Sequence, residues 1–472
     1  MFRIQPVYTP KLWEAILLSL WILLSIFVSI FSFSSAPQVP ILIAILVLMG
    51  YGFIRNVPLK DLEDGMVDGA KSGIQAIYIF FFIGILISSW MLSGTIPTVM
   101  YGGFELIVPQ YFYAIVFLLT AIVGVCIGSS LTTVATVGVA FIGISSALDL
   151  SLPITAGAIV SGAFFGDKMS PLSDTTNLAA SIVKVDLFEH IRNMSWTTVP
   201  ALIITLVVFV FMSPSEISSN FSKVEEMKQA LLDSGLVHWD SLIPLILLFI
   251  LTIFKVPTLF TLAISSLSAI VIAFIYHEHL TISQLFSVLF GGFVSETGNE
   301  AIDALLSRGG INSMMFTISL VLLALSMGGL LFKLGIVPSI LQAIDQWLKN
   351  RQSVVLASVL SGIGVNLLAG EQYLSILLTG EAFQSHYQRL GLANKNLSRV
   401  LEDAGTVINP LVPWGVCGVF IASVLGVPTL EYVPFAFFCL LSPLITVLFG
   451  FTGWTLTYLS TPVKEKAIGV KS

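Results

Sequence analysis

Long apolar runs follow one another along almost the whole chain, and they constrain its fold more than any other feature. A helix needs about 20 apolar residues to cross the hydrocarbon core of a bilayer. Only 10% of the 472 residues are charged, whereas soluble domains carry about 25%. The sequence therefore predicts an all-helical membrane protein, with the lipid bilayer as a partner and no role in nucleic-acid binding. The runs cover about residues 12–34, 38–54, 73–93, 111–148, 153–183, 194–213, 239–254, 257–276, 312–333, 353–385, 398–427 and 433–459.

Four of these runs are interrupted by polar residues and glycines at membrane depth. The runs 111–148 and 353–385 are longer than one span, and polar residues and glycines break each of them. We expect both to form re-entrant hairpins. The runs 153–183 and 398–427 contain polar segments and prolines, and we expect each to be a broken helix. Irregular backbone must be shielded from lipid, so these breaks should lie inside the protein or line a wet cavity.

The two halves of the chain repeat one order of elements. Repeats of this kind are typical of secondary transporters. We expect a first repeat over residues 1–213, an external linker over 214–238, a second repeat over 239–460 and a cytoplasmic tail over 461–472. The matching pairs are Gly128 and Gly370, Gly138 and Gly380, Phe141 and Phe383, Pro171 and Pro413, Gly94 and Gly335, and Pro97 and Pro338.

The distribution of positive charge predicts that the second repeat is inverted. If each hairpin enters and leaves on one side, five helices cross the membrane in each half, and an odd number inverts the second half. With the N-terminus in the cytoplasm, positive residues then gather in cytoplasmic segments, as the positive-inside rule requires. We therefore expect both termini in the cytoplasm. Counting the hairpins as double spans places the C-terminus on the same side, so charge alone leaves that alternative open. The exceptions among the 21 Lys and Arg residues are Lys168, Lys223, Lys228 and Arg308.

Inserting an ionisable group at membrane depth costs a free energy of about 2.5–3.5 kcal/mol, so each such group is a candidate functional residue. Three acidic residues stand out, Asp167 and Asp174 in the first broken helix and Glu371 in the second hairpin. Neutral residues that could supply further ligands lie near these acids or at the other breaks. They are Ser129, Ser130, Thr133, Ser173, Thr175, Asn177, Asn366, Gln372 and Asn409.

This set of residues predicts a cation site. Sodium takes oxygen ligands from carboxylates, hydroxyls and the carbonyls that broken helices set free. Burial disfavours the charged form of an empty carboxylate, and a bound cation restores it. Proton and sodium then compete for one group, which is the minimum that an antiporter needs. We expect sodium at Asp167, Asp174 and Glu371, and no cofactor.

Structural roles compete with binding roles at several positions. Lys168 could form an ion pair with its neighbour Asp167 or take part in a proton relay, and Asp174 could cap the second half-helix. Glu402 and Asp403 could lie in water near the cytoplasmic surface, and Asp403 could instead relay protons to the cytoplasm.

Catalytic signatures do not occur in the sequence. No phosphate-binding loop, catalytic triad or metal-ligand spacing is found. This argues against an ATP-driven pump and against an enzyme. A channel or sensor built on a transporter fold stays open as a different class.

Several segments resemble the NhaC family of sodium/proton antiporters, and the likeness extends over nearly the whole chain. It implies inverted repeats with re-entrant hairpins, a homodimer, and exchange of sodium for protons by alternating access across the cytoplasmic membrane. The segments are G-D-K-M-S-P-L-S-D-T-T-N-L-A (166–179), D-L-F-E-H-I-R (186–192), A-G-E-Q-Y (369–373), N-L-S-R-V-L-E-D-A-G-T (396–406) and P-L-V-P-W (410–414).

The resemblance also widens the choice of substrate. Similar proteins include sodium- and proton-coupled exchangers of malate for lactate and sodium-coupled amino-acid carriers. The alternative is therefore a small carboxylate substrate that binds helix N-termini and Lys168. Glu371 stands where relatives often carry Asp, and Gly415 and Val416 stand where they often carry Asn and Thr. The loss of two polar groups there predicts a smaller or altered ligand set.

Overall fold

In the computed structural model the chain is helical throughout the described residues, which are 5–33, 35–106, 109–214, 221–295, 303, 306–344 and 348–459. Part of the predicted linker (215–220) and the predicted tail (461–472) lie outside them. The first half contains α1 (Leu12–Phe33), α2 (Gln38–Ile54), α3 (Leu59–Ser72), α4 (Ile74–Leu92), α5 (Thr95–Leu106), α6 (Phe112–Ile127), α7 (Ser130–Thr133), the π-helical turn η2 (Val134–Gly138), α8 (Val139–Ala147), α9 (Leu152–Met169), α10 (Asp174–Ile182) and α11 (Leu187–Met212).

The second half follows α12 (Phe221–Asp233) and again contains both long and short helical elements. Its elements are α13 (Ile243–Ile253), α14 (Thr258–Tyr276), α15 (Ile282–Gly291), α17 (Ile311–Lys333), α18 (Ile336–Ile344), α19 (Arg351–Ala369), α20 (Gln372–Arg389), α21 (Asn394–Val400), the π-helical turn η5 (Leu401–Thr406), η6 (Asn409–Leu411), α22 (Val416–Leu425), α23 (Thr429–Tyr432), η7 (Val433–Phe435) and α24 (Phe437–Thr452).

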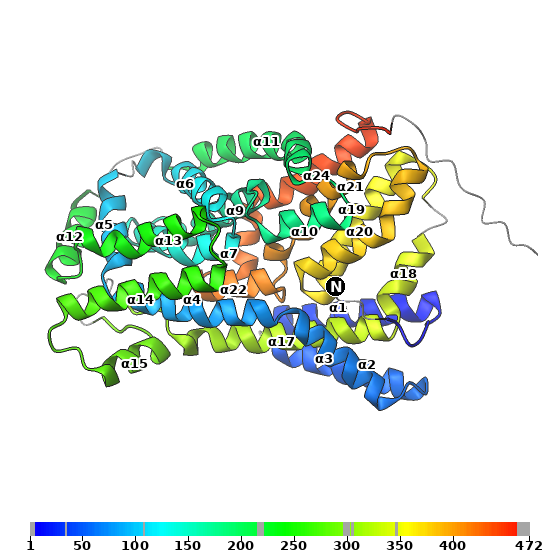
Figure 1. Ribbon diagram of the computed structural model, residues 1–472, viewed down its shortest axis with the longest axis horizontal. Helices are drawn as coiled ribbons and strands as arrows, with labels where there is room; N and C mark the ends of the chain where they lie inside the picture. Colours follow the sequence, from blue (N-terminus) through cyan, green and yellow to red (C-terminus); the bar gives the residue numbers. More distant parts are fainter. Residues whose placement is uncertain are drawn as a thin grey trace, which may run out of the picture.

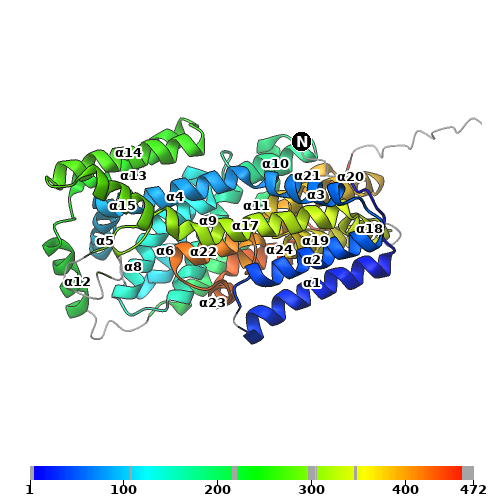
Figure 2. The ribbon, with the colours of Figure 1, turned by 90° about the horizontal axis from the view of Figure 1, so that it is seen from below.

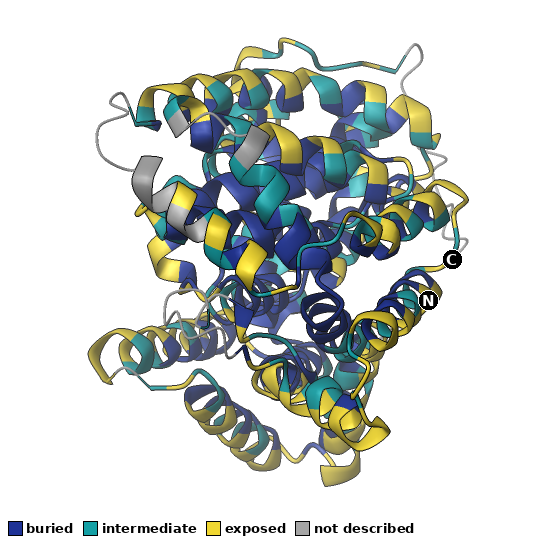
Figure 3. Cartoon of the chain, turned by 90° about the vertical axis from the view of Figure 1, so that its left-hand side faces the viewer, coloured by how far each residue is buried: buried dark blue, intermediate teal, exposed yellow. Residues whose placement is uncertain are grey.

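Seven helices among the described residues are long and apolar enough to cross a membrane, and two bent pairs raise the number to nine. Large apolar side chains point outward on these helices; Leu20 is 61% exposed and Phe260 is 64% exposed. Figure 3 shows buried residues gathered at the centre and exposed residues on the outer helices. A chain with an apolar outside of this extent is stable only in lipid. The protein is thus an all-helical, multi-span membrane protein, as the sequence predicts.

Two long helical segments pack along each other. α3 and α4, separated only by Gly73, run antiparallel to α17, with Gly65 beside Lys333 and Gly84 beside Gly310. A Cβ at Gly84 would lie 2.6 Å from the Gly310 carbonyl oxygen, so glycine is what allows this approach. Figure 1 shows α4 beside α14 and α17, and Figure 2 shows α2 beside α17, with α1 on the other side of α2. α3 is therefore an extension of α4 that packs along α17.

Two helix breaks cross each other in the first half. α6 ends at Gly128, whose φ of +69° is a conformation that glycine adopts without strain. Ser129 then caps α7 by accepting a hydrogen bond from the Thr132 N–H. α9 ends before Pro171, which has no N–H to continue a helix. A Cβ at Gly128 would lie 2.7 Å from the Cβ of Leu172, so the tip of the first hairpin packs directly on the break between α9 and α10.

The second half places two breaks in the same relation. α19 ends at Gly370 with a φ of +68°, and Glu371 caps α20. The Gly370 carbonyl accepts a hydrogen bond from the Val416 N–H at 2.8 Å. The chain bends by 44° between residues 394–411 and α22. All four breaks fall within the runs that the sequence predicts to be interrupted.

Candidate functional site

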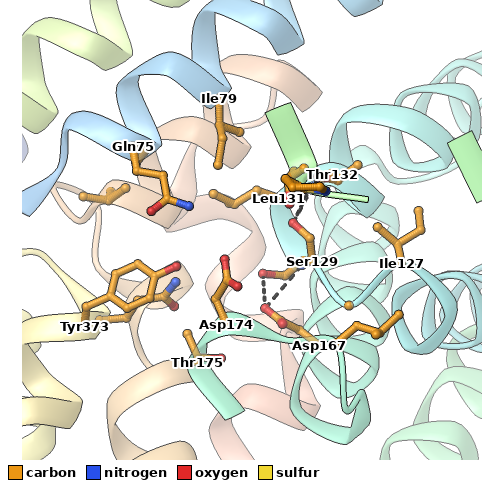
Figure 4. A pocket seen from close by; sticks show the side chains of 18 of the residues that line it. Gln75, Ile79, Ile127, Ser129, Leu131, Thr132, Asp167, Asp174, Thr175 and Tyr373 are labelled. Atoms are coloured by element: carbon orange, nitrogen blue, oxygen red, sulfur yellow. Dashed lines mark hydrogen bonds between the residues drawn. The ribbon is translucent and has the colours of Figure 1, made fainter. Parts of the chain in front are cut away.

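A cavity of about 410 Å³ lies where the two breaks of the first half face the tip of the second hairpin. Figure 4 shows side chains from α4, α7, α9, α10 and α20 around it. Seven of the residues predicted to bind ions or substrate line this cavity. They are Ser129, Ser130, Asp167, Asp174, Thr175, Glu371 and Gln372.

Asp167 forms the floor of the cavity near the end of α9. It is only 4% exposed. Its Oδ2 accepts hydrogen bonds from the Ser130 hydroxyl at 2.7 Å and from the Ser130 N–H at 3.3 Å. Two donors on one oxygen fix the orientation of the carboxylate, which faces the cavity (Figure 4). Charge-assisted bonds of this kind are the stronger class of hydrogen bond.

Asp174 lies at the first position of α10 and is exposed at the wall of the cavity. A carboxylate in the first turn of a helix is favoured by the helix dipole. The helix is capped by Ser173, which accepts from the Thr176 N–H, so Asp174 is not the capping residue. Its neighbour Thr175 also lines the cavity and bonds to the Ser173 hydroxyl at 3.0 Å.

Glu371 and Gln372 approach from the second hairpin. Glu371 is 5% exposed, and its Oε2 accepts a hydrogen bond from the Leu374 N–H at 2.7 Å. Gln372 is 7% exposed, and its Oε1 is buried without a hydrogen-bond partner in the described part of the chain. Burying an unpaired carbonyl oxygen costs about 1–3 kcal/mol. A bound ligand or water that donates to or coordinates this oxygen would remove that cost.

The three acidic side chains share the cavity without meeting at one point. Within the described ranges, no three His, Cys, Asp or Glu side chains lie close enough together to hold one metal ion. An ion in the cavity would therefore meet one carboxylate together with hydroxyl, amide and carbonyl oxygens. The three predicted acids, Asp167, Asp174 and Glu371, therefore line one cavity at separate points. Their oxygens offer ligands to an ion at more than one position in it.

Three predicted ligands from the first half support the helix breaks and do not line the cavity. The Thr133 hydroxyl donates to the Ser129 carbonyl at 2.9 Å. Ser173 caps α10, and the Asn177 side chain donates to the Ser173 carbonyl at 2.7 Å and to the Pro171 carbonyl at 3.1 Å. These side chains satisfy backbone groups that the broken helices leave without helical partners.

Asn366 and Asn409 are also placed away from the cavity. Asn409 Nδ2 donates to Asn366 Oδ1 at 2.9 Å, and Asn409 Oδ1 accepts from the Cys417 N–H at 2.8 Å. Asn366 Nδ2 donates to the carbonyls of Ala404 and Gly405. Both amides are fully buried and saturated by protein groups, so they fasten α19, η5 and α22 together.

Lys168 pairs with Asp403 and not with its neighbour Asp167. Lys168 Nζ donates to Asp403 Oδ1, while Thr197 and Thr446 donate to Asp403 Oδ2 at 2.9 and 2.5 Å. Lys168, Glu402 and Asp403 are all 0% exposed. The alternative that Glu402 and Asp403 lie in water therefore does not hold. The ion pair joins α9 of the first half to η5 of the second.

Several cavity residues are absent from the predicted set. Gln75 and Ile79 come from α4, Tyr373 follows Gln372, and Lys255 comes from the loop between α13 and α14. Gln75 and Lys255 lie at the ends of apolar runs, where polar residues are common at membrane surfaces. Only their place in the tertiary fold distinguishes them, so the sequence gives no signal for them.

The chain is similar to known proteins over most of its length. Residues 162–454 match the Na+/H+ antiporter family. The chain is 44% identical to the Na(+)/H(+) antiporter NhaC of Alkalihalophilus pseudofirmus, over 93% of this chain and 95% of that protein. It is 41% identical to the NhaC of Bacillus subtilis, over 88% and 92%. It is 33% identical to the malate-2H(+)/Na(+)-lactate antiporter of Bacillus subtilis, over 98% and 100%.

Proposed function

The chain belongs to the Na+/H+ antiporter family, and from that premise we propose that it exchanges sodium ions for protons across the cytoplasmic membrane. It is a transporter and not an enzyme. The observation that carries the proposal is the cavity at the helix breaks, which Asp167, Asp174 and Glu371 line within an otherwise apolar protein. Carboxylates at that depth are costly unless they bind an ion or a proton.

In the proposed site Asp167 is the principal charged ligand for sodium. Ser130 holds its carboxylate in place, and the hydroxyl of Ser129 lies beside it on the same wall. The unpaired Oε1 of Gln372 supplies a neutral oxygen from the second half. Hydroxyl, amide and carboxylate oxygens are the ligands that hard cations prefer.

Asp174 and Glu371 extend the site in two directions. Asp174 is exposed, so it attracts cations to the cavity from water. Glu371 is buried on the opposite side and offers a second carboxylate to an ion that moves inward. Sodium binding that releases protons from carboxylates of the protein couples the two fluxes. The apparent affinity for sodium then falls as the pH falls, by up to about tenfold per pH unit for each proton displaced.

We also propose the arrangement of the scaffold in the membrane. The paired breaks support two inverted repeats of five crossing helices, each with a re-entrant hairpin and a broken helix. The distribution of Lys and Arg supports cytoplasmic N- and C-termini. The exposed apolar faces of the outer helices leave room for a homodimer. Alternating access would then expose the cavity to each side in turn.

Vesicles that contain only the purified protein test the function. An imposed proton gradient, reported by a pH-sensitive dye inside the vesicles, should be dissipated when sodium is added to the outside without any organic solute. Dissipation that requires malate, lactate or an amino acid would contradict simple sodium/proton antiport. Potassium at the same concentration is the control for non-specific leakage.

A second function has one observation in its favour. The cavity of about 410 Å³ is much larger than a single ion, and the N-terminal ends of α7, α10 and α20 face it. Helix N-termini attract anions such as carboxylates. Coupled exchange of a small organic anion, as the name of the malate-lactate relative describes for that protein, is therefore the alternative that the same vesicle assay distinguishes.

A further inference from the structure

Glu402 is a buried acid with no role in the site described above. It lies in the π-helical turn η5 and is 0% exposed. Neither of its carboxyl oxygens has a hydrogen-bond partner in the described part of the chain. The Thr406 hydroxyl lies near the carboxyl but makes no hydrogen bond of acceptable geometry to it. π-helical turns inside α-helices are frequent at functional sites.

The charges around Glu402 give this acid no counter-ion of its own. It interacts electrostatically with Asp167, Lys168 and Asp403. Lys168 is already paired with Asp403, so that pair is neutral. The remaining partner, Asp167, is an acid and repels a second negative charge. An ionised Glu402 would thus be a buried anion without a hydrogen bond or an ion pair in the described part of the chain, which is among the most costly states in a protein.

The elements packed against η5 carry the other titratable groups of this region. α9 provides Asp167 and Lys168, α10 provides Asp174, α24 provides Cys439, and α19 carries Arg351 at its exposed end. α20 and α21 carry the remaining ones, which are Tyr373, Glu381, His386, Tyr387, Arg389, Lys395 and Arg399. His190 on α11 interacts electrostatically with Lys168, and its Nδ1 makes a hydrogen bond with the Ser398 hydroxyl at 2.8 Å.

We propose that Glu402 is a proton-carrying site of the exchange, separate from the carboxylates that meet sodium in the cavity. The inference rests on the proposed function and deepens it. Glu402 holds a proton while the cavity is empty. When sodium binds at Asp167, the positive ion cancels the repulsion between the two acids, and the Glu402 carboxyl releases its proton to water. One positive charge enters the cluster and one leaves, so the charge buried there stays constant.

Two transport assays on one variant separate this role from the sodium site. Uptake of radioactive sodium driven by a pH gradient needs the proton site, whereas exchange of sodium for sodium at uniform pH does not. In Glu402→Gln, gradient-driven uptake should fall by about tenfold or more, a size typical of coupling between sites. Sodium-for-sodium exchange should stay within about threefold of the native rate, which is below the range of such couplings. Glu381→Gln, the same change at an exposed position of α20, is the matched control and should alter neither rate.

The outcomes distinguish the inference from the function itself. If the native protein shows no gradient-driven sodium uptake, the proposed function fails. If the native protein shows it and Glu402→Gln retains it in full, only the proton site at Glu402 is wrong. Parallel loss of both exchanges in a variant that remains monodisperse would also overturn the inference, since Glu402 would then serve the sodium site or the fold.

A second variant covers the case in which glutamine does not fold at this position. Glu402→Asp keeps a carboxyl but shortens the side chain by one methylene group. We expect gradient-driven uptake to persist with its pH profile displaced from that of the native protein. An unchanged pH profile in this variant would contradict a titrating role for Glu402.

Discussion

The broken helix of the first half and the broken helix of the second half share a backbone arrangement but differ in their chemistry. At the offset that relates Gly128 to Gly370, Asp167 corresponds to Asn409 and Asp174 corresponds to Val416. The first segment thus carries two acids at the cavity, whereas the second carries none. The hairpin tips show the reverse, because Ser129 in the first half corresponds to Glu371 in the second.

The difference shows that each half has one segment that presents charge and one that holds the structure. In the second broken helix, the Asn409 side chain donates a hydrogen bond to Asn366 Oδ1 and accepts one from the Cys417 N–H. The Val416 N–H donates a hydrogen bond to the Gly370 carbonyl. In the first broken helix, the Asp167 carboxylate accepts hydrogen bonds from the Ser130 hydroxyl and N–H and faces the cavity. Both segments therefore have a backbone break, while the acidic side chains face the cavity from only one of them.

Replacing Asp167 by Asn makes the first segment like the second and should have the largest effect. We expect sodium-dependent dissipation of the proton gradient to fall at least about 100-fold, equivalent to about 2.7 kcal/mol, because the charged ligand is lost. Initial rates in vesicles measure this. Asp186→Asn is the matched control, since Asp186 caps α11 outside the cavity and Asn caps helices equally well. Full activity in Asp167→Asn would remove Asp167 from the proposed site.

The reverse change, Asn409→Asp, tests the structural half of the comparison. An aspartate would place a carboxylate oxygen against Asn366 Oδ1 in place of the donor that lies there at 2.9 Å. The variant should be destabilised by about 2–3 kcal/mol, because a buried acceptor then faces an acceptor. The midpoint of thermal unfolding in detergent measures this, with Asp167→Asn as the comparison that should unfold near the native temperature. Equal midpoints for Asn409→Asp and the native protein would show that the amide network is not needed.

Replacing Glu371 by Ser makes the second hairpin tip like the first. Serine caps a helix as well as an acid does, so α20 should remain intact while one buried carboxylate is lost. We expect the KM for sodium to rise by about tenfold, or about 1.4 kcal/mol, with little change in unfolding temperature. Glu371→Ala removes the cap as well and should lower stability by a further amount of about 1 kcal/mol. A KM for sodium that is unchanged in Glu371→Ser would assign Glu371 to capping alone.

Asp174→Asn should have the smallest effect, because Asp174 is exposed. Exposed charges contribute about 0.2–1 kcal/mol, so the KM for sodium should rise by no more than about fivefold. The rise should shrink when choline chloride increases the ionic strength, because salt screens exposed charges. An effect as large as that of Asp167→Asn, insensitive to salt, would instead place Asp174 in direct contact with the ion.

The sequence predicts where the helices break better than it predicts whether the side chains near a break face the cavity or bond to the backbone. Gly128, Pro171, Gly370 and Pro413 act through local backbone geometry, and the structure breaks its helices at or beside each of them. Whether a polar side chain near a break faces the cavity or the backbone depends on its partner. Asn177, Asn409 and Gln372 are all side-chain amides near a break, yet of the three only Gln372 has a buried oxygen without a hydrogen-bond partner.

By itself, then, the sequence determined that this chain lies in a membrane, where its helices break, and which family it resembles, because hydropathy, glycine and proline act over short distances. The tertiary structure decided which acids share a cavity and which are neutralised. Lys168 forms an ion pair with Asp403, 235 residues away. Because Lys168 is paired there, it pairs with neither Asp167, which faces the cavity, nor Glu402. Contacts between the two halves decide that outcome, and no local pattern encodes them.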